Sequence, residues 1–342
     1  MRDFIAGLPK AELHVHHVGS ASPRIVAELA SRHGDSPVPP EPEKLAGYFA
    51  FTDFAHFIEV YLSVVDLVRT PEDVRMLTYE VARDMTSQQI RYAELTCTPY
   101  TSMIRGVPAE AFCEAIEDAR VAAERDFGLV LRWCFDIPGE LGLPAAAETA
   151  RIACELQPAA LVSFGLGGPE VGVPRGQFKP FFDQARAAGL HSVPHAGETT
   201  GPETIWAALR DLGAERIGHG TSATQDLGLV EHLVNAGIAL EVCPTSNVAT
   251  GAVPSLAEHP INAMHEAGVV VTVNSDDPPM FGTSLNQEYA VAADLLGLNE
   301  NGVADLARTA VRASFAGADV KQRLLSEIDA TGSSACSVAG AT

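Results

Sequence analysis

Residues 12–16 of the chain read Glu12-Leu13-His14-Val15-His16, and the rest of the sequence can be placed around them. The apolar residues beside the two histidines are typical of a β-strand. Because alternate side chains of a strand point to the same face, the two imidazoles share a face, as two ligands of one metal ion must. A half-buried strand that carries two histidines and no metal has the same pattern, since histidine is also a common core residue. Other motifs have to decide between these interpretations.

Short apolar runs recur along the chain, and a helix-like segment follows each of them. The runs cover residues 12–18, 90–98, 129–138, 160–166, 189–198, 215–220, 238–247 and 268–278. Several are continuous apolar stretches, which are typical of parallel strands covered on both faces. The repeated strand–helix unit predicts an α/β fold of the (β/α)8 TIM-type barrel class. A doubly wound open sheet is the alternative, but no Gly-x-Gly-x-x-Gly motif opens the first helix.

The chain is longer than the ~250 residues of a typical barrel, and the excess lies between the first two strands. Residues 20–89 exceed one strand-to-strand crossover, and residues 53–69 have the pattern of an amphipathic helix. We predict that extra helices here cap the C-terminal mouth of the barrel, where substrate pockets form. We expect a single metal-dependent hydrolase domain over residues 1–330 and a flexible C-terminal tail over the small, polar residues 331–342.

Charge and composition restrict the class of partner. The net charge of −21 argues against nucleic acid, whose recognition requires a basic face. The six cysteines are scattered without a Cys-x-x-Cys pair, which is typical of a reduced, cytosolic chain. No apolar run approaches the ~20 residues of a membrane span, and the N-terminus lacks the apolar core of a signal peptide. We expect a cytoplasmic protein that acts on a small molecule and binds neither nucleic acid nor a membrane.

Polar residues follow the ends of five of the expected strands. They are His14 and His16, His195 with Glu198, His219, the run 243–247 and the run 274–278. In a barrel of this class the C-terminal strand ends face one mouth, where catalytic residues lie. Histidines and acids on so many strands are difficult to explain as core packing. We therefore expect these side chains to form one site.

The residue types in this set indicate metal chemistry. Three histidines and one carboxylate suit zinc with one position open for water. His14, His16, His195 and either Asp276 or Asp277 complete the set, and the other aspartate is free to hold substrate. A bound metal would lower the pKa of its water toward neutrality. Glu198, three residues after His195, is placed to transfer protons, and His219 would orient the water or stabilise developing negative charge.

Six motifs in this order resemble the adenosine deaminase family of the amidohydrolase superfamily, from Leu8 to about Phe315. They are residues 8–16, 165–170, 195–198, 216–220, 243–247 and 275–278. The resemblance implies hydrolytic deamination of a 6-aminopurine nucleoside, in which an oxo group replaces the amine and ammonia is released. It implies one zinc ion, with iron or manganese fitting similar ligands, held by His14, His16, His195 and Asp276.

The resemblance also implies roles for the other polar residues at the strand ends. Glu198 protonates the purine ring nitrogen N1, and His219 activates the hydroxide. Asp277 hydrogen-bonds purine N7, and the backbone amide of Gly168 meets N3.

Other enzyme and binding classes remain as alternatives. The zinc deaminase signature of His-x-Glu with Pro-Cys-x-x-Cys is absent from the sequence. A metal-bridging lysine is absent at the end of the fourth strand, which reads Ser163-Phe164-Gly165, and this weakens a two-metal amide or phosphoester hydrolase. An adenosine or adenine deaminase of purine salvage is the nearest alternative. An inactive nucleoside-binding protein on the same scaffold would have no need of the proton donor Glu198.

The sequence departs from the family pattern where the substrate's 5′ end is expected. Val18 stands where an acid meets the ribose 5′-hydroxyl in adenosine deaminases, and a buried hydroxyl left unpaired costs about 1–3 kcal/mol. His17 is a further candidate contact. The run from His16 to Arg24 resembles actinobacterial relatives that deaminate 6-aminodeoxyfutalosine, an intermediate of menaquinone biosynthesis. That nucleoside carries a carboxyphenyl-ketone arm in place of the hydroxyl, and its carboxylate would need a cation, for which Arg24, Arg69 and Arg175 are candidates.

Overall fold

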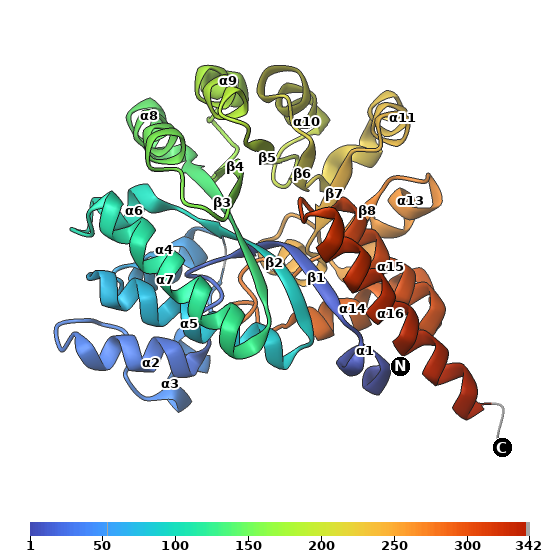
Figure 1. The fold of residues 1–342 in the computed structure, drawn as a ribbon. Coiled ribbons are helices and arrows are strands. Elements are labelled where there is room, and N and C mark those ends of the chain that lie inside the picture. Colours follow the sequence, from blue (N-terminus) through green and yellow to red (C-terminus); the bar gives the residue numbers. More distant parts are fainter. Residues whose placement is uncertain (53, 340–342) are drawn as a thin grey trace.

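Eight parallel strands form a barrel in the computed structural model, which describes residues 1–52 and 54–339. The strands pair in chain order, each with the next, and form the centre of Figure 1. They are β1 (Lys10–His16), β2 (Ile90–Cys97), β3 (Val130–Pro138), β4 (Leu161–Gly167), β5 (His191–Ala196), β6 (Arg216–His219), β7 (Ala239–Val242) and β8 (Val271–Val273). The predicted TIM-type barrel is confirmed.

The barrel closes where the first strand meets the segment after the last one. Val15 of β1 pairs in parallel with Asp276, three residues beyond β8. Two backbone hydrogen bonds support this contact, from His16 N to Asp276 O at 2.9 Å and from Asp276 N to His14 O at 3.1 Å. The closure therefore brings the histidines of β1 next to the acid that follows β8.

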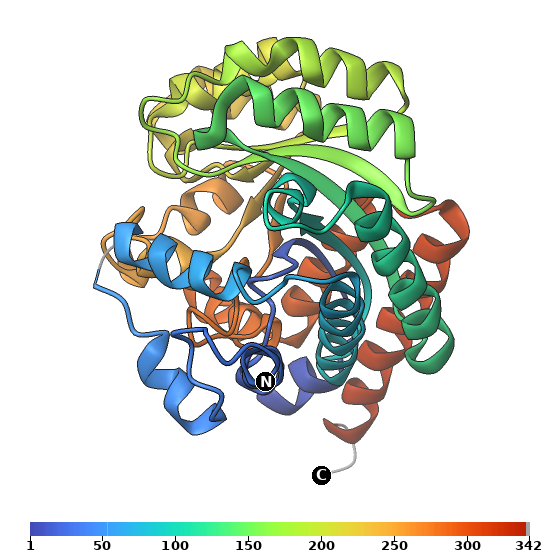
Figure 2. The ribbon, with the colours of Figure 1, turned by 90° about the vertical axis from the view of Figure 1, so that its left-hand side faces the viewer.

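The helices surround this barrel, as Figures 1 and 2 show from two directions. They are α1 (Arg2–Gly7), α2 (Pro23–Arg32), α3 (Pro42–Tyr48), α4 (Phe54–Val65), α5 (Pro71–Ser87), α6 (Pro99–Met103), α7 (Ala109–Phe127), α8 (Gly142–Arg151), α9 (Lys179–Ala187), α10 (Pro202–Ala207), α11 (Leu227–Ala236), α12 (Pro244–Ala249), α13 (Ile261–Glu266), α14 (Leu285–Leu296), α15 (Glu300–Ala313) and α16 (Ala318–Ala339). Because helices cover the outside of the sheet, the strands are buried on both faces, which explains their continuous apolar runs.

The extra helices expected between the first two strands are α2, α3, α4 and α5, which lie together in Figure 1. The helix α5 begins with a capping box, in which Thr70 accepts from Asp73 N while the Asp73 carboxylate accepts from Thr70 N. The helix α4 supplies Phe57, Ile58, Tyr61 and Leu62 to a cavity that also contains strand-end residues. One of the extra helices therefore covers the barrel mouth.

The last two strands are shorter than the sequence indicates. The run 238–247 contains only the strand Ala239–Val242, because Pro244 opens the helix α12 and proline has no backbone N–H for the ladder. The run 268–278 contains only Val271–Val273, because Asp276 adopts a left-handed backbone conformation with φ of 65°. The remaining residues of both runs form the turns that carry polar side chains at the mouth.

The C-terminal helix α16 continues as far as Ala339, and residues 340–342 lie outside the described part of the chain. The flexible tail over 331–342 and the single domain over 1–330 stay predictions. Over the described residues, every helix is too short or too polar to cross a membrane.

Candidate active site

Four candidate metal ligands converge at the mouth of the barrel. His14 and His16 come from β1, His195 from β5, and Asp276 from the turn after β8. Their ligand atoms all lie within 4.8 Å of one another. The shortest distances are 3.2 Å from His16 Nε2 to Asp276 Oδ1 and 3.3 Å from His16 Nε2 to His195 Nε2. The structure thus brings together the four residues that the sequence motifs single out.

These residues fit a divalent metal ion. His14 Nε2 is buried and has no hydrogen-bond partner among the described residues, although it lies 3.6 Å from Asp276 Oδ1. A buried polar nitrogen without a partner is costly unless a ligand satisfies it. Three imidazoles and one carboxylate form a donor set that zinc prefers, and iron or manganese accepts similar ligands.

A buried network of hydrogen bonds and ion pairs orients the His14 ring. His14 Nδ1 contacts Glu241 Oε2 at 2.9 Å, and Arg216 Nε donates to Glu241 Oε1 at 2.6 Å. Arg216 also forms an ion pair with the buried carboxylate of Glu94. A carboxylate on the second ring nitrogen fixes the tautomer of a metal-ligating histidine, so that Nε2 faces the metal position. Gly218 leaves room for this ring, because a Cβ at that position would lie 2.7 Å from His14 Cε1.

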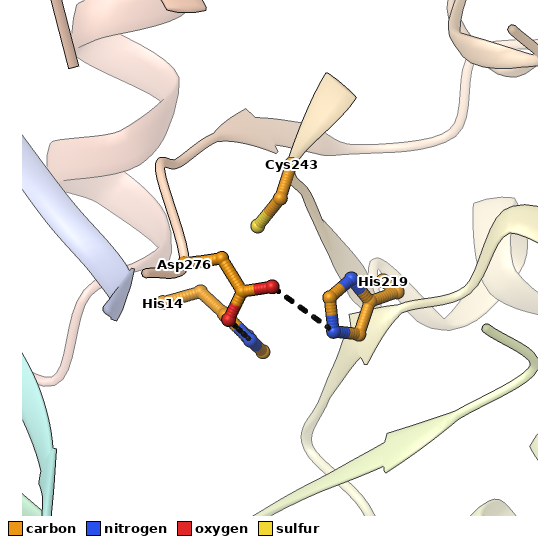
Figure 3. A group of neighbouring side chains, drawn as sticks. All are labelled: His14, His219, Cys243 and Asp276. Carbon is orange, nitrogen blue, oxygen red and sulfur yellow. Dashed lines mark ion pairs between the residues drawn. The ribbon is translucent and has the colours of Figure 1, made fainter. Parts of the chain in front are cut away.

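A second group of possible ligands overlaps the first. Figure 3 shows Asp276 between His14 and His219, with Cys243 beside them. The group that contains Cys243 offers two imidazoles, a thiol and a carboxylate, whereas the other group offers the three imidazoles and one carboxylate that suit zinc with a position open for water. The group that contains His16 and His195 is therefore the better metal site, and His219 remains available to substrate or water.

Glu198 lies in the turn after β5 and faces His219. Its Oε2 is 3.6 Å from His219 Nε2, and its Oε1 accepts from Thr250 Oγ1 at 3.4 Å. Burial, followed by the negative charge of Asp276, raises the pKa of Glu198 to about 8. A carboxyl group with this pKa is protonated at neutral pH and can donate a proton, which suits general acid catalysis.

His219 is held as a neutral imidazole. Burial lowers its pKa to about 3, and Asn247 Nδ2 donates to His219 Nδ1 at 3.0 Å. Asn247 Oδ1 in turn lies 3.2 Å from His259 Nε2, which fixes the amide. Because Nδ1 accepts this hydrogen bond, the ring proton is on Nε2, which points toward Glu198 and Asp276.

The turn that carries Glu198 is fixed by Glu170. The carboxylate of Glu170 accepts from Thr199 N and Thr200 N at 3.0 Å and from Thr200 Oγ1 at 2.6 Å. Glu170 is the last residue of the motif over residues 165–170, but no role for it was predicted from the sequence. Its place as the last residue of that motif could have identified Glu170 as a functional residue.

Three of the four candidate ligands, His16, His195 and Asp276, line a cavity of about 320 Å³. Gly168 and Asp277 line it, as the family pattern implies. Asp277 Oδ1 is buried without a partner in the described part of the chain, and burial raises the pKa of Asp277 to about 7. The backbone of Gly19 packs against this carboxylate, since a Cβ on Gly19 would lie 1.5 Å from Asp277 Oδ1. Asp277 therefore lines the cavity with its Oδ1 held against the backbone of Gly19.

Asp136 at the end of β3 also lines the cavity, and sequence analysis did not select it. Thr98 Oγ1 donates to Asp136 Oδ1 at 2.5 Å, and burial raises the pKa of this carboxyl group. Its position as the acid near the end of a predicted strand was the signal that could have identified it.

Two candidate substrate contacts, His17 and Val18, are not among the described residues that line the cavity. His17 is buried on the other side of the backbone, where its Nε2 contacts Thr78 Oγ1 of α5 at 2.8 Å. The reason is strand alternation, because the residue after His16 points away from the face that His16 occupies. Val18 is partly buried and packs against the hydrophobic core.

The three arginines considered for a substrate carboxylate also lie elsewhere. Arg24 pairs with Glu80 and Asp84, and Arg69 pairs with Asp35, both at the protein surface. Arg175 is buried 3.5 Å from Glu170. None of the three is among the described residues around the cavity.

The chain is similar to known deaminases over nearly its whole length. The family model described as "Adenosine deaminase" matches residues 9–331. The aminodeoxyfutalosine deaminases of Streptomyces coelicolor and Streptomyces avermitilis are 71% and 69% identical, over 95% and 96% of this chain and 85% and 92% of their own lengths. The crystal structure of adenine deaminase from Arthrobacter aurescens is 32% identical, has a TM-score of 0.89, and shares 94% of this chain and 98% of its own.

Proposed function

Because the chain belongs to the adenosine deaminase family, we propose that it hydrolyses the 6-amino group of 6-aminodeoxyfutalosine, an adenine nucleoside with a carboxyphenyl-ketone arm. The reaction replaces the amine with an oxo group and releases ammonia, and we assign it to menaquinone biosynthesis in the cytoplasm. The observation that carries this proposal is the identity of about 70% to two aminodeoxyfutalosine deaminases, which extends over nearly the whole chain.

His14, His16, His195 and Asp276 would hold one divalent ion, for which zinc is our proposal. When bound, such an ion supplies Lewis acidity that makes a water molecule more nucleophilic. The hydrogen bond from Ser246 Oγ to Asp276 Oδ2, at 2.6 Å, and the contact of Glu241 with His14 would keep two of these side chains in place.

The proton transfers belong to Glu198 and His219. Glu198 is protonated at neutral pH, so it can donate to the ring nitrogen N1 as the nucleophile adds to the adjacent carbon. His219 presents Nε2–H toward the same space, where it orients the attacking water and stabilises the negative charge that develops. Both groups act at the side of the ring that carries the amine.

Asp277 and Gly168 would hold the purine. A carboxyl group with a pKa of about 7 can donate a hydrogen bond to N7. The backbone amide of Gly168, which also lines the cavity, would meet N3. Together these contacts would orient the 6-amino group toward Glu198.

The apolar part of the cavity lining would suit an arm on the ribose. Its walls include the apolar side chains Phe57, Tyr61, Leu62 and Phe281. Burying a phenyl-sized group against such a wall contributes about 25 cal/mol per Å² of apolar area. Adenine deamination is the second candidate, favoured by the similarity to the Arthrobacter aurescens enzyme, but free adenine would leave this apolar region unfilled.

Steady-state kinetics on the zinc-loaded protein test the proposal. The panel is 6-aminodeoxyfutalosine, 5′-methylthioadenosine, adenosine and adenine, with ammonia release as the readout. We expect the highest kcat/KM for 6-aminodeoxyfutalosine and an intermediate value for 5′-methylthioadenosine. Preference for adenosine or adenine over both modified nucleosides would replace this proposal with a purine salvage activity.

A further inference from the structure

The charges around the cavity are unsuited to an anionic substrate, with one exception. Among the described residues that line it, five carry a carboxyl group and one carries a guanidinium, that of Arg105. The acids are Asp136, Glu140, Glu198, Asp276 and Asp277. The net charge of the chain, −21, adds to this repulsion. A substrate carboxylate therefore needs a local cation, and Arg105 is in position to provide it.

Arg105 is held rigidly and still has donors to spare. Its Nε donates to Asp66 Oδ1 at 2.6 Å, and its NH1 donates to Thr101 O at 3.0 Å. A guanidinium carries five N–H donors in a fixed plane, and these two bonds use only two of them. The NH2 group has no hydrogen-bond partner within the described ranges of the chain. A planar fork with free donors suits bidentate binding of a carboxylate.

Large apolar side chains line the same cavity as Arg105 and remain open to solvent. Leu62 is 37% exposed, Ile104 is 57% exposed, and Leu141 is 42% exposed, and all three line the cavity. By contrast, the Arg105 side chain is only 19% exposed. An aryl ring that bears a carboxylate would cover these apolar groups and place its charge at the guanidinium.

We infer that Arg105 binds the carboxylate at the end of the substrate's aryl arm, with Leu62, Ile104 and Leu141 against the ring, and so determines specificity. This inference rests on the proposed function, because it assumes a substrate with such an arm. Arg105 replaces Arg24, Arg69 and Arg175 as the candidate cation, because none of these three lines the cavity. The recognition is by charge and shape, at the opposite end of the substrate from the reacting amine.

The test compares 6-aminodeoxyfutalosine with its methyl ester, which keeps the arm but removes the charge. Arg105→Gln should lower kcat/KM for the acid by roughly 10- to 100-fold, because a hydrogen bond to a charged group contributes about 1.5–3 kcal/mol. It should lower kcat/KM for the ester by much less, so the acid-to-ester ratio falls. Arg105→Lys, which keeps a point charge without the fork, should restore part of that ratio.

Arg69→Gln is the matched control, because Arg69 also pairs with an exposed aspartate near α4 but does not line the cavity. It should leave the acid-to-ester ratio of the wild type unchanged. Zinc content and circular dichroism verify that each variant is folded. An acid-to-ester ratio that Arg105→Gln does not change overturns the role of Arg105. Failure of the proposed function gives a different result, namely that the wild type prefers adenosine to both acid and ester.

Discussion

Two residues at the centre of the site adopt a left-handed backbone conformation that is rare for residues other than glycine. His219 has a φ of 62° and Asp276 a φ of 65°. Residues in this region cost of order 1–3 kcal/mol each, and they persist where the surroundings fix them. Asn247 fixes the ring of His219, and Ser246 fixes the carboxylate of Asp276. Both fixing residues come from α12, the helix that Pro244 opens. We interpret the strain at these two positions as the cost of directing both side chains into the site.

Replacing Glu198 separates proton transfer from metal binding. Glu198→Gln keeps the shape of the side chain and its contact with Thr250 but removes the acidic proton. We expect unchanged zinc content and a fall in kcat of ~10²–10⁴-fold, the usual contribution of general acid–base catalysis. Metal analysis and ammonia release provide the two readouts. Turnover near that of the wild type would show that another group supplies the proton.

A substitution at Gly19 tests the position of the neighbouring Asp277 carboxylate. Gly19→Ala would place a Cβ 1.5 Å from the present position of Asp277 Oδ1, so the carboxylate must move. We expect kcat/KM to fall roughly 10²-fold, as a misplacement of about 1 Å can cost that much, with zinc content retained. Gly7→Ala is the control, because its Cβ would meet nothing within 4 Å. Equal activity of the two variants would argue against contact of Asp277 with the purine.

At the scale of elements, the turns after the strands carry the site and the strands below them carry its support. Glu94 of β2, Arg216 of β6 and Glu241 of β7 meet inside the barrel, and Glu241 continues to His14. The ring of Phe315 covers the guanidinium of Arg216 at 3.9 Å. This network connects three strands and one metal-ligand candidate, so its loss should affect stability as well as the site.

Removing one member of that network should be strongly destabilising. Glu94→Ala leaves the buried Arg216 with one carboxylate instead of two and removes the acceptor for Tyr92 Oη and Phe315 N. Breaking a buried ion pair in this way costs about 3–5 kcal/mol. Glu124→Ala is the control, because the half-exposed pair of Glu124 with Arg120 should contribute at most about 1 kcal/mol. Urea unfolding measures both, and equal free energies of unfolding would contradict the role of the network.

The sequence predicts these elements well and the contacts between them poorly. The apolar runs and the acids and histidines at their ends were sufficient for the barrel and for the convergence of His14, His16, His195 and Asp276. The direction of the His17 side chain could also have been predicted, because alternation along the strand places it opposite His16. The position of Arg105 in the cavity could not be predicted from the sequence. It depends on how α6 and the α4–α5 connection pack, and no periodic pattern encodes that packing.

At the scale of the whole molecule, one barrel mouth combines two regions of different character. The strand ends provide the histidines and acids, and α4 and the segment after α6 provide apolar side chains together with Arg105. The first region matches a chemistry that the family shares, and the second is where a substrate arm would be recognised. The helix α4, inserted between β1 and β2, and the segment after α6 that carries Ile104 and Arg105 are therefore expected to control which nucleoside is accepted, while the barrel itself controls the reaction.

A competition experiment tests this account most directly. Zinc-loaded protein receives equal concentrations of 6-aminodeoxyfutalosine and adenosine in one vessel, and chromatography follows both deaminated products at early times. The product ratio equals the ratio of the two kcat/KM values, so differences in enzyme concentration or metal content cancel. We predict at least a tenfold excess of the deaminated 6-aminodeoxyfutalosine, equivalent to about 1.4 kcal/mol of additional transition-state binding. Faster formation of the product from adenosine would contradict the account.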